Sequence, residues 1–222
     1  LEWHSPLFSL RDASCTLIIR IHDRAKPEPF RSGRGASRLI TKAFRYPRSA
    51  VRQSPDHCDI EFPAGRIFER DGDYHIAVKE SGLVINLFLR RQSAPIAAAT
   101  EELYRSRRDQ SYFAWNIALP RAQAAGLIDI DDRRIEVRGS AYHDHNWGTV
   151  VFRRHFRKWI WMRIFFDDFT FIFSEIDALD LDGPPLRPLI FTDRRGRPIA
   201  TGRPTVEYSP EERPEPGPLR LP

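Results

Sequence analysis

The chain is poor in cysteine and has no long apolar run, and each absence removes a class of protein. Among its 222 residues the cysteines are Cys15 and Cys58. Two cysteines do not make a disulfide framework, so we predict a reducing compartment and a cytoplasmic location. No stretch reaches the roughly 18 apolar residues of a membrane-spanning helix, so no transmembrane segment is expected. The chain starts at Leu1 without a methionine or a signal-like segment, and we expect further residues upstream.

Motifs of phosphate, redox and nucleophile chemistry are also missing. The sequence has no Gly-rich phosphate loop, no paired CxxC element and no nucleophile elbow. Its formal charge is +5, from 35 basic and 30 acidic residues, which is typical of an ordinary surface. Residues 31–48 hold six basic side chains and no acidic one, and they are predicted to form a mobile loop. An anion contact there, or a nucleic-acid interface, is the weaker alternative, and we predict no nucleic-acid partner.

What the chain does contain is apolar and aromatic. Hydrophobic residues make up 41% of it, with fifteen Phe and five Trp. Each aromatic side chain can bury about 150–250 Å², so a wide cavity or thick sheet packing is expected. The length suits one large all-β domain or two small ones.

The periodicity of the apolar residues is mostly that of β-strands. The predicted strands and hairpins are 16–21, 67–70 with 74–79, 83–89, 112–119 ending at Pro120, 128–130 with 135–137, and 159–166 with 169–176. The best helical candidate is the short stretch 97–107. The last twenty residues hold six prolines and are expected to be irregular. The predicted fold class is all-β, with a meandering antiparallel β-barrel as the architecture.

One segment, Tyr142–Gly148, concentrates the chemistry of the chain. On an extended strand, alternate side chains point to opposite faces. One face then carries His143, His145 and Trp147, and the other carries Tyr142, Asp144 and Asn146. Polar groups on both faces need partners, so the segment is either a hydrogen-bonded clamp between two pieces of structure or a reaction site.

This motif, with Glu2-Trp3 near the start and Trp115-Asn116 before Pro120, resembles the lipocalin-like carotenoid 1,2-hydratase (hydroxyneurosporene synthase) family. The resemblance extends over about residues 1–200. That broad family includes decalin-forming Diels–Alderases, and tocopherol cyclases are more distantly similar. The resemblance implies two lipocalin-like β-barrel domains, a hydrophobic pocket at or near their junction, and no organic cofactor. We therefore predict a barrel domain at 1–148, a partial or reduced second β domain at 149–202, and a Pro-rich tail at 203–222.

The chain departs from the family pattern in two places. Family members often open with Glu-Trp-Trp-Tyr, where this chain has Glu2-Trp3-His4-Ser5. The downstream Asp of the hydratases has no clear match, and the nearest carboxylates are Glu175 and Asp177. A complete second barrel would also need more sequence than follows Gly148. Either the second domain is reduced, or a homo-oligomer or partner chain completes it.

The predicted function is a cofactor-independent enzyme that cyclises or hydrates a hydrophobic polyene, a polyketide or isoprenoid, in natural-product biosynthesis. A cationic route needs a buried carboxyl group that keeps its proton and aromatic faces that stabilise a cation by about 0.5–2 kcal/mol each. A pericyclic route, of the Diels–Alder type, needs mainly a shaped cavity, where orientation contributes roughly 7–11 kcal/mol. The predicted catalytic residues are His143, Asp144, His145, Asn146 and Trp147. The predicted substrate-binding residues are Trp3, Trp115, Asn116, Tyr142, Trp159, Trp161 and Glu175.

Other interpretations stay open. Asp144 and Asn146 can serve only to lock strands and loops together. His143 and His145 could reach one metal ion, but no third ligand has a characteristic spacing, so no metal site is predicted. Trp159 and Trp161 can be simple core or cavity lining. A non-catalytic lipid-binding protein of the same fold is the main alternative function. An enzyme requires an apolar pocket beside the strand His143–Trp147.

Overall fold

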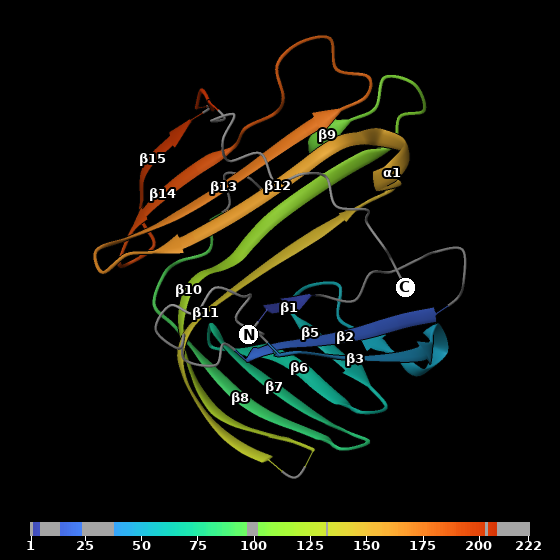
Figure 1. Cartoon of the computed structure of the whole chain (residues 1–222), viewed down its shortest axis with the longest axis vertical. Helices are drawn as coiled ribbons and strands as arrows, with labels where there is room; N and C mark the ends of the chain where they lie inside the picture. Colours follow the sequence, from blue (N-terminus) through green and yellow to red (C-terminus); the bar gives the residue numbers. More distant parts are fainter. Residues whose placement is uncertain are drawn as a thin grey trace, which may run out of the picture. The chain divides into compact units, whose positions relative to one another are not determined.

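The computed structural model describes residues 2–4, 14–23, 38–96, 102–131, 133–202 and 204–207; for 2–4, 22–23, 38–39 and 201 it describes the backbone alone. The described chain is nearly all β, which confirms the predicted fold class (Figure 1). Its elements are β1 (Glu2–His4), β2 (Ser14–Asp23), β3 (Arg38–Pro47), η1 (Arg48–Ala50), β4 (Arg52–Gln53), β5 (Asp59–Phe62), β6 (Gly65–Arg70), β7 (Asp73–Glu80), β8 (Leu83–Arg91), β9 (Glu102–Arg105), β10 (Tyr112–Ile130), β11 (Arg133–Gly148), α1 (Phe152–His155), β12 (Phe156–Phe165), β13 (Phe169–Ala178), β14 (Leu189–Asp193) and β15 (Pro198–Gly202). Within the described ranges, no helix has the length and apolar character needed to cross a membrane.

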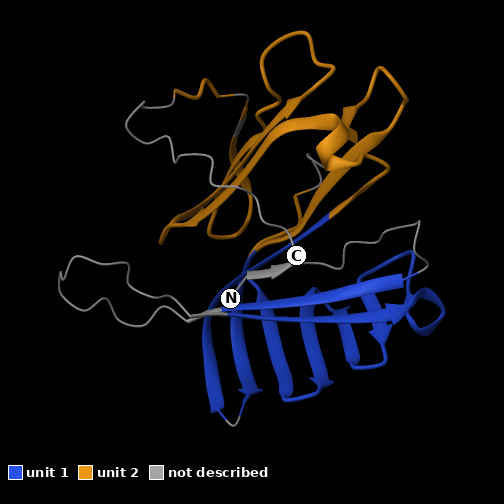
Figure 2. Ribbon diagram, turned by 45° about the vertical axis from the view of Figure 1, so that its right-hand side comes forward, with its two compact units in different colours: residues 1–92, 121–145 blue, residues 93–120, 146–222 orange. Residues whose placement is uncertain are grey.

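The chain divides into two compact units (Figure 2). Unit 1 comprises 1–92 and 121–145, and unit 2 comprises 93–120 and 146–222. The chain passes from one unit to the other at 92/93, 120/121 and 145/146, and the last two passages lie within the long strands β10 and β11, which therefore belong to both units. The predicted boundary after residue 148 differs from this division, because 93–120 group with the C-terminal unit.

Unit 1 is built from two sheets. A three-stranded sheet has the order β1-β2-β3, and a longer sheet has the order β11-β10-β8-β7-β6-β5-β4, with β9 paired to β10 in the part of β10 that belongs to unit 2. Alternating burial along β7 and β8 places one row of side chains in the core: Tyr74, Ile76, Val78, Leu83, Ile85, Leu87 and Leu89. Among the described strands, β4 and β11 end the longer sheet without pairing to each other. The predicted closed, lipocalin-like barrel is therefore not confirmed.

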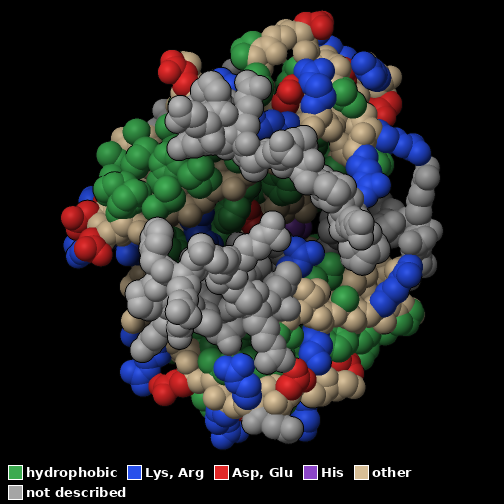
Figure 3. Space-filling view, in the orientation of Figure 1, with side chains coloured by type: hydrophobic (Ala, Val, Ile, Leu, Met, Phe, Trp, Pro, Cys, Tyr) green, Lys and Arg blue, Asp and Glu red, His purple; other side chains and the backbone are tan. Residues whose placement is uncertain are grey.

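Unit 2 contains a four-stranded antiparallel sheet of order β12-β13-β14-β15. One face of this sheet is buried, with Ile172, Ile176 and Ile190 almost fully covered. The other face carries a row of phenylalanines in mutual contact, including Phe169, Phe171 and Phe191. Hydrophobic side chains gather over this sheet in the space-filling view (Figure 3). The predicted apolar hairpin of 159–166 with 169–176 is confirmed as β12 and β13.

Three local predictions were wrong. The strand predicted to stop at Pro120 continues to Ile130. Pro120 lies between the part of β10 that pairs with β9 and the part that pairs with β8. Its missing N–H therefore interrupts neither of these two ladders. The predicted helix of 97–107 is strand β9 at 102–105, while 97–101 lie outside the described residues. The predicted basic loop is strand β3 from 38 to 47, paired with β2 throughout, and 31–37 lie outside the described residues. Pairing with a neighbouring strand made β9 and β3 strands, although the local sequence pattern of each segment had favoured a helix and a loop.

Gly148 ends β11 where the strand lies against the backbone of β10. Its φ is +144°, and a Cβ there would lie 2.0 Å from the Tyr112 carbonyl oxygen. We expect Gly148→Ala to lower the free energy of unfolding by about 1–3 kcal/mol, because the backbone must move to relieve the clash. Gly139→Ala on the same strand is the matched control, since a Cβ there meets no atom within 4 Å. Urea unfolding of both variants tests this, and equal midpoints would contradict it.

Candidate functional site

The motif residues of β11 do not share one environment. The side chains of Tyr142, His143 and Asp144 are half-buried, whereas those from His145 to Trp147 are exposed. Between His145 and Asn146 the strand also passes from unit 1 to unit 2. The five predicted catalytic residues thus divide into two groups, with His143, Asp144 and His145 in unit 1.

His143 contacts Tyr74, a residue of β7 that the sequence analysis did not select. The two ring centroids are 4.9 Å apart and the planes meet at 67°, an edge-to-face contact. β7 and β11 stand three places apart in the strand order, which in a flat sheet would separate them by about 14 Å. The contact therefore requires the sheet of unit 1 to curve between β7 and β11. His143 and Tyr74 meet over the concave face of this sheet.

Small and aliphatic side chains form that concave face between the two rings. Tyr74 lies opposite Leu89, and Leu89 lies opposite Ala124 on β10. Ala122 on β10 lies opposite Arg91 on β8 and is fully buried. Directly opposed residues share one face of a sheet, so Leu89, Ala122 and Ala124 share this face with Arg91, which lies opposite Ala122, and with Glu69, which lies opposite Tyr74.

Burial makes His143 a neutral imidazole near pH 7. Burial, and to a smaller extent His145, lower the pKa of His143 from 6.5 to about 4. The ring touches water along part of its surface, but its Nδ1 atom is fully covered and has no hydrogen-bond partner among the described residues. Leaving such an atom unpaired costs about 1–3 kcal/mol, so this position needs a structural or functional explanation.

Tyr74 supplies a permanently protonated phenol beside that imidazole. Burial is the main reason that the pKa of Tyr74 is raised to about 12, and electrostatic interactions with Cys58 and Glu69 add to this shift. The charge of Arg91 and its hydrogen bond to Tyr74 partly oppose it. Arg91 in turn faces Glu69, with 3.8 Å between Nη2 and Oε1. Burial also raises the pKa of the Cys58 thiol to about 11, which keeps it protonated and unreactive. No local pattern in the sequence links these residues, because they lie on separate strands.

Two further ionisable residues of the motif hydrogen-bond each other. The Tyr142 hydroxyl donates a hydrogen bond of 3.1 Å to Asp144 Oδ2, as their shared strand face predicts. Burial lowers the pKa of His145, and the negative charge of Asp144 partly opposes this shift. By alternation, Asp144 points away from the face that carries His143. The structure therefore places the carboxylate and the buried imidazole on opposite faces of β11.

The predicted substrate-binding residues fall mostly in unit 2. Trp115 is only 2% exposed and lies in the core of that unit, with Asn116 half-buried beside it. Trp159 and Trp161 are about 40% exposed on β12, and the Trp159 Nε1 atom donates a 3.0 Å hydrogen bond to Ser174 Oγ. The Trp3 side chain lies outside the described residues. The substrate-binding roles of these residues stay predictions.

Glu175 is the most deeply buried carboxylate of unit 2. It is 2% exposed, and its oxygens lie 2.7 Å from Arg187 Nε and 3.0 Å from Lys158 Nζ. Two cations so close favour the ionised form of a carboxyl group. This environment suits structural pairing better than proton donation.

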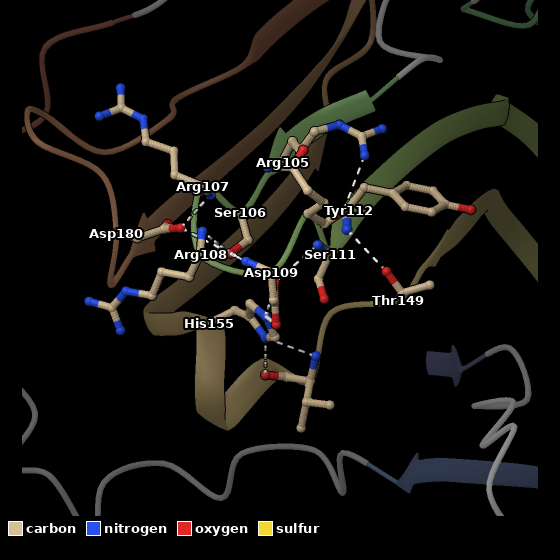
Figure 4. A network of polar contacts seen from close by, with 12 residues as sticks. Arg105, Ser106, Arg107, Arg108, Asp109, Ser111, Tyr112, Thr149, His155 and Asp180 are labelled. Atoms are coloured by element: carbon tan, nitrogen blue, oxygen red, sulfur yellow. Dashed lines mark hydrogen bonds and ion pairs between the residues drawn. The ribbon is translucent and has the colours of Figure 1, made fainter.

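A second polar network in unit 2 surrounds the β9–β10 loop (Figure 4). His155, at the end of α1, is buried and its Nε2 atom lies 3.1 Å from Asp109 Oδ2. Hydrogen bonds from the Ser111 backbone N–H and from Ser106 lower the pKa of Asp109. Tyr104 and Ser106 both hydrogen-bond the carboxylate of Asp180. Every group here is satisfied within the network, so it serves to hold the loop and α1 in place.

A small apolar cavity of about 20 Å³ lies in unit 1, enough for about one water molecule. Its lining comes from β2, β3, β5 and β6 with Val51, and none of it from β11. In the described part of the chain, no three His, Cys, Asp or Glu side chains are grouped to hold a metal ion.

Comparison with known proteins gives limited but consistent results. No family model matches the chain. A hydroxyneurosporene dehydrogenase from Chlorobaculum tepidum is 31% identical over 87 residues, which cover 36% of this chain and 23% of that protein. The similarity is to a carotenoid-related protein. This chain thus matches less than a quarter of the relative's length.

A solved structure from Nitrosomonas europaea, provisionally named AttH, shares the fold. The TM-score is 0.58 at 13% identity, over 86% of this chain and 62% of that chain. At this identity the likeness shows the fold alone.

Proposed function

We propose that this protein is a cofactor-independent enzyme that binds a hydrophobic polyene, an isoprenoid or polyketide, against the concave face of unit 1 and cyclises or hydrates it. The observation that carries the proposal is the neutral His143 beside Tyr74, on a sheet face that combines aliphatic side chains with the Arg91–Glu69 pair. The partial identity with a protein named for hydroxyneurosporene supports a carotenoid-like substrate.

The two rings favour cyclisation over acid-initiated hydration. With a pKa of about 12 the Tyr74 hydroxyl is a weak acid, and with a pKa of about 4 His143 holds no extra proton near pH 7. Neither group can readily protonate an alkene. They can hydrogen-bond a substrate while the curved sheet orients its chain, and orientation is what an intramolecular cyclisation mostly needs. Asp144 points to the other face of β11, so a hydration that used it as the acid would take place on that face and not against the concave face.

Turnover of hydroxyneurosporene by the purified chain tests the proposal, with products separated by chromatography and identified by mass. Hydration adds the mass of one water, and cyclisation leaves the mass unchanged. We expect His143→Phe to reduce turnover about 100-fold, because it removes the hydrogen bond that orients and polarises the substrate but keeps the ring contact with Tyr74. Asp144→Asn reduces turnover comparably if the reaction is a hydration. Trp147→Ala, which removes a predicted catalytic side chain, should also reduce it.

Glu136→Gln is the matched control, because Glu136 is exposed on the same strand and pairs with Arg138. It should keep full turnover. Saturable binding of the polyene without any product would assign the chain to the alternative, a lipid-binding protein. Unchanged turnover in both His143→Phe and Asp144→Asn would contradict the roles given to them.

A further inference from the structure

We infer that unit 2 docks onto the surface of an anionic lipid membrane through α1 and the residues around it. The docking surface, here called the α1 patch, consists of Arg108, Val151, Arg153, Arg154 and Leu179. All five side chains are exposed, and they combine three guanidinium groups with two aliphatic groups. The inference concerns where the protein binds, and it does not rest on the reaction proposed for unit 1.

The single turn of α1 separates its side chains by direction. Residues three apart lie on the same face of a helical turn, and Phe152 and His155 both pack inward. His155 is 7% exposed, and the Phe152 ring lies against Phe113 with 5.6 Å between the ring centroids. Arg153 and Arg154, between these two inward residues, are exposed. The turn therefore presents two neighbouring guanidinium groups to solvent.

Hydrogen bonds join the rest of the patch to this turn. The Leu179 backbone N–H donates to the His155 carbonyl oxygen at 2.8 Å, and Arg108 Nη2 donates to the Leu179 carbonyl oxygen at 3.5 Å. His155 Nδ1 lies 2.9 Å from the Val151 carbonyl oxygen. The guanidinium of Arg108 points away from the network around Asp109 (Figure 4). This network therefore holds the backbone of the patch in place, while the side chains of the patch face solvent.

The three arginines of the α1 patch have no acidic partner within the described ranges. Other arginines of the same part of unit 2 do have one, in the pairs Arg105–Glu102, Arg107–Asp182 and Arg157–Asp177. Charges that are not balanced within the protein attract a surface of opposite sign. The patch is therefore complementary to an anionic partner.

The aliphatic side chains distinguish a lipid surface from other anionic partners. Val151 is 50% exposed and Leu179 is 36% exposed. A nucleic acid offers them little, because its phosphates need hydrogen-bond donors and its bases stack mainly on aromatic rings. An anionic bilayer places phosphate groups next to acyl chains, so it accepts guanidinium groups and aliphatic side chains together. Such a surface is also where a hydrophobic polyene dissolves.

Co-sedimentation of the full chain with lipid vesicles tests the inference. Vesicles of phosphatidylcholine with about one-third phosphatidylglycerol should bind the chain about 100-fold more tightly at low salt than vesicles of phosphatidylcholine alone. Added salt should weaken this preference. The double variant Arg153→Gln with Arg154→Gln should lower the affinity for anionic vesicles about 30-fold, because two cations at the surface are lost. Val151→Ser should lower it severalfold at any salt concentration, because its contribution is apolar.

Arg134→Gln with Arg138→Gln is the matched control. It removes the same charge from β11 in unit 1, where both arginines pair with acidic residues. Its affinity for anionic vesicles should stay close to that of the original chain. An equal loss in the two double variants would overturn the inference, because net charge alone would then explain the binding.

Three other results would overturn the inference as well. One is equal affinity for neutral and anionic vesicles, or binding to neither. Another is an affinity that Val151→Ser leaves unchanged. The third is retention of a single-stranded oligonucleotide without vesicle binding, lost in Arg153→Gln with Arg154→Gln, which would assign the patch to a nucleic acid. The turnover assay separately decides the proposed function.

Discussion

Acidification is expected to destabilise this protein through His143, and His143→Phe should remove much of that sensitivity. The pKa of His143 is about 4 in the folded chain and about 6.5 when it is unfolded. Between these values the unfolded chain binds more protons, so this stabilisation is fully present above pH 6.5 and is lost as the pH falls toward 4. At 1.36 kcal/mol per pKa unit the loss is about 3 kcal/mol, an upper figure because part of the ring touches water.

The measurement is the free energy of unfolding in urea at pH 7 and at pH 4, followed by circular dichroism. The original chain should lose up to about 3 kcal/mol more than His143→Phe between the two pH values. His145 and the carboxylates contribute to both chains and largely cancel in the difference. His75→Phe serves as control and should follow the original chain. Parallel pH curves for the original chain and His143→Phe would show that the imidazole is not buried as described.

The second large effect concerns the buried carboxylate of unit 2. Arg187→Ala removes from Glu175, which is 2% exposed, its closest described cation, and Lys158, at 3.0 Å, is itself 41% exposed. Removing one member of a buried pair typically costs about 3–5 kcal/mol, because the remaining charge stays desolvated. Trp fluorescence should report this loss well, since Trp115, Trp147, Trp159 and Trp161 all lie in unit 2.

Two further variants separate the penalty of a lone charge from the loss of packing. The double variant Glu175→Leu with Arg187→Leu should recover most of the stability, because no buried charge remains. Arg157→Ala breaks the more exposed pair with Asp177 and should cost no more than about 1 kcal/mol. Equal losses in Arg187→Ala and Arg157→Ala would contradict the special position of Glu175.

Local patterns predicted most of the strands. The turn Asp71–Gly72 between β6 and β7 was correct, because turn residues and alternation act over a few positions. The sequence analysis missed the strand β3 and the continuation of β10 past Pro120, because neither follows from a local pattern. Both depend on which strand lies alongside, and a basic or proline-containing segment carries no local sign of its partner.

By itself the sequence determined the all-β class, the hairpins and the concentration of ionisable groups in Tyr142–Gly148, since each follows from the alternation of side chains along a strand. Only the tertiary structure decided which of those groups is buried. His143 meets Tyr74 because the sheet curves between β7 and β11, and Asp144 faces away because it is one residue further along. Curvature accumulates over several paired strands, so no single segment encodes the burial that lowers the pKa of His143.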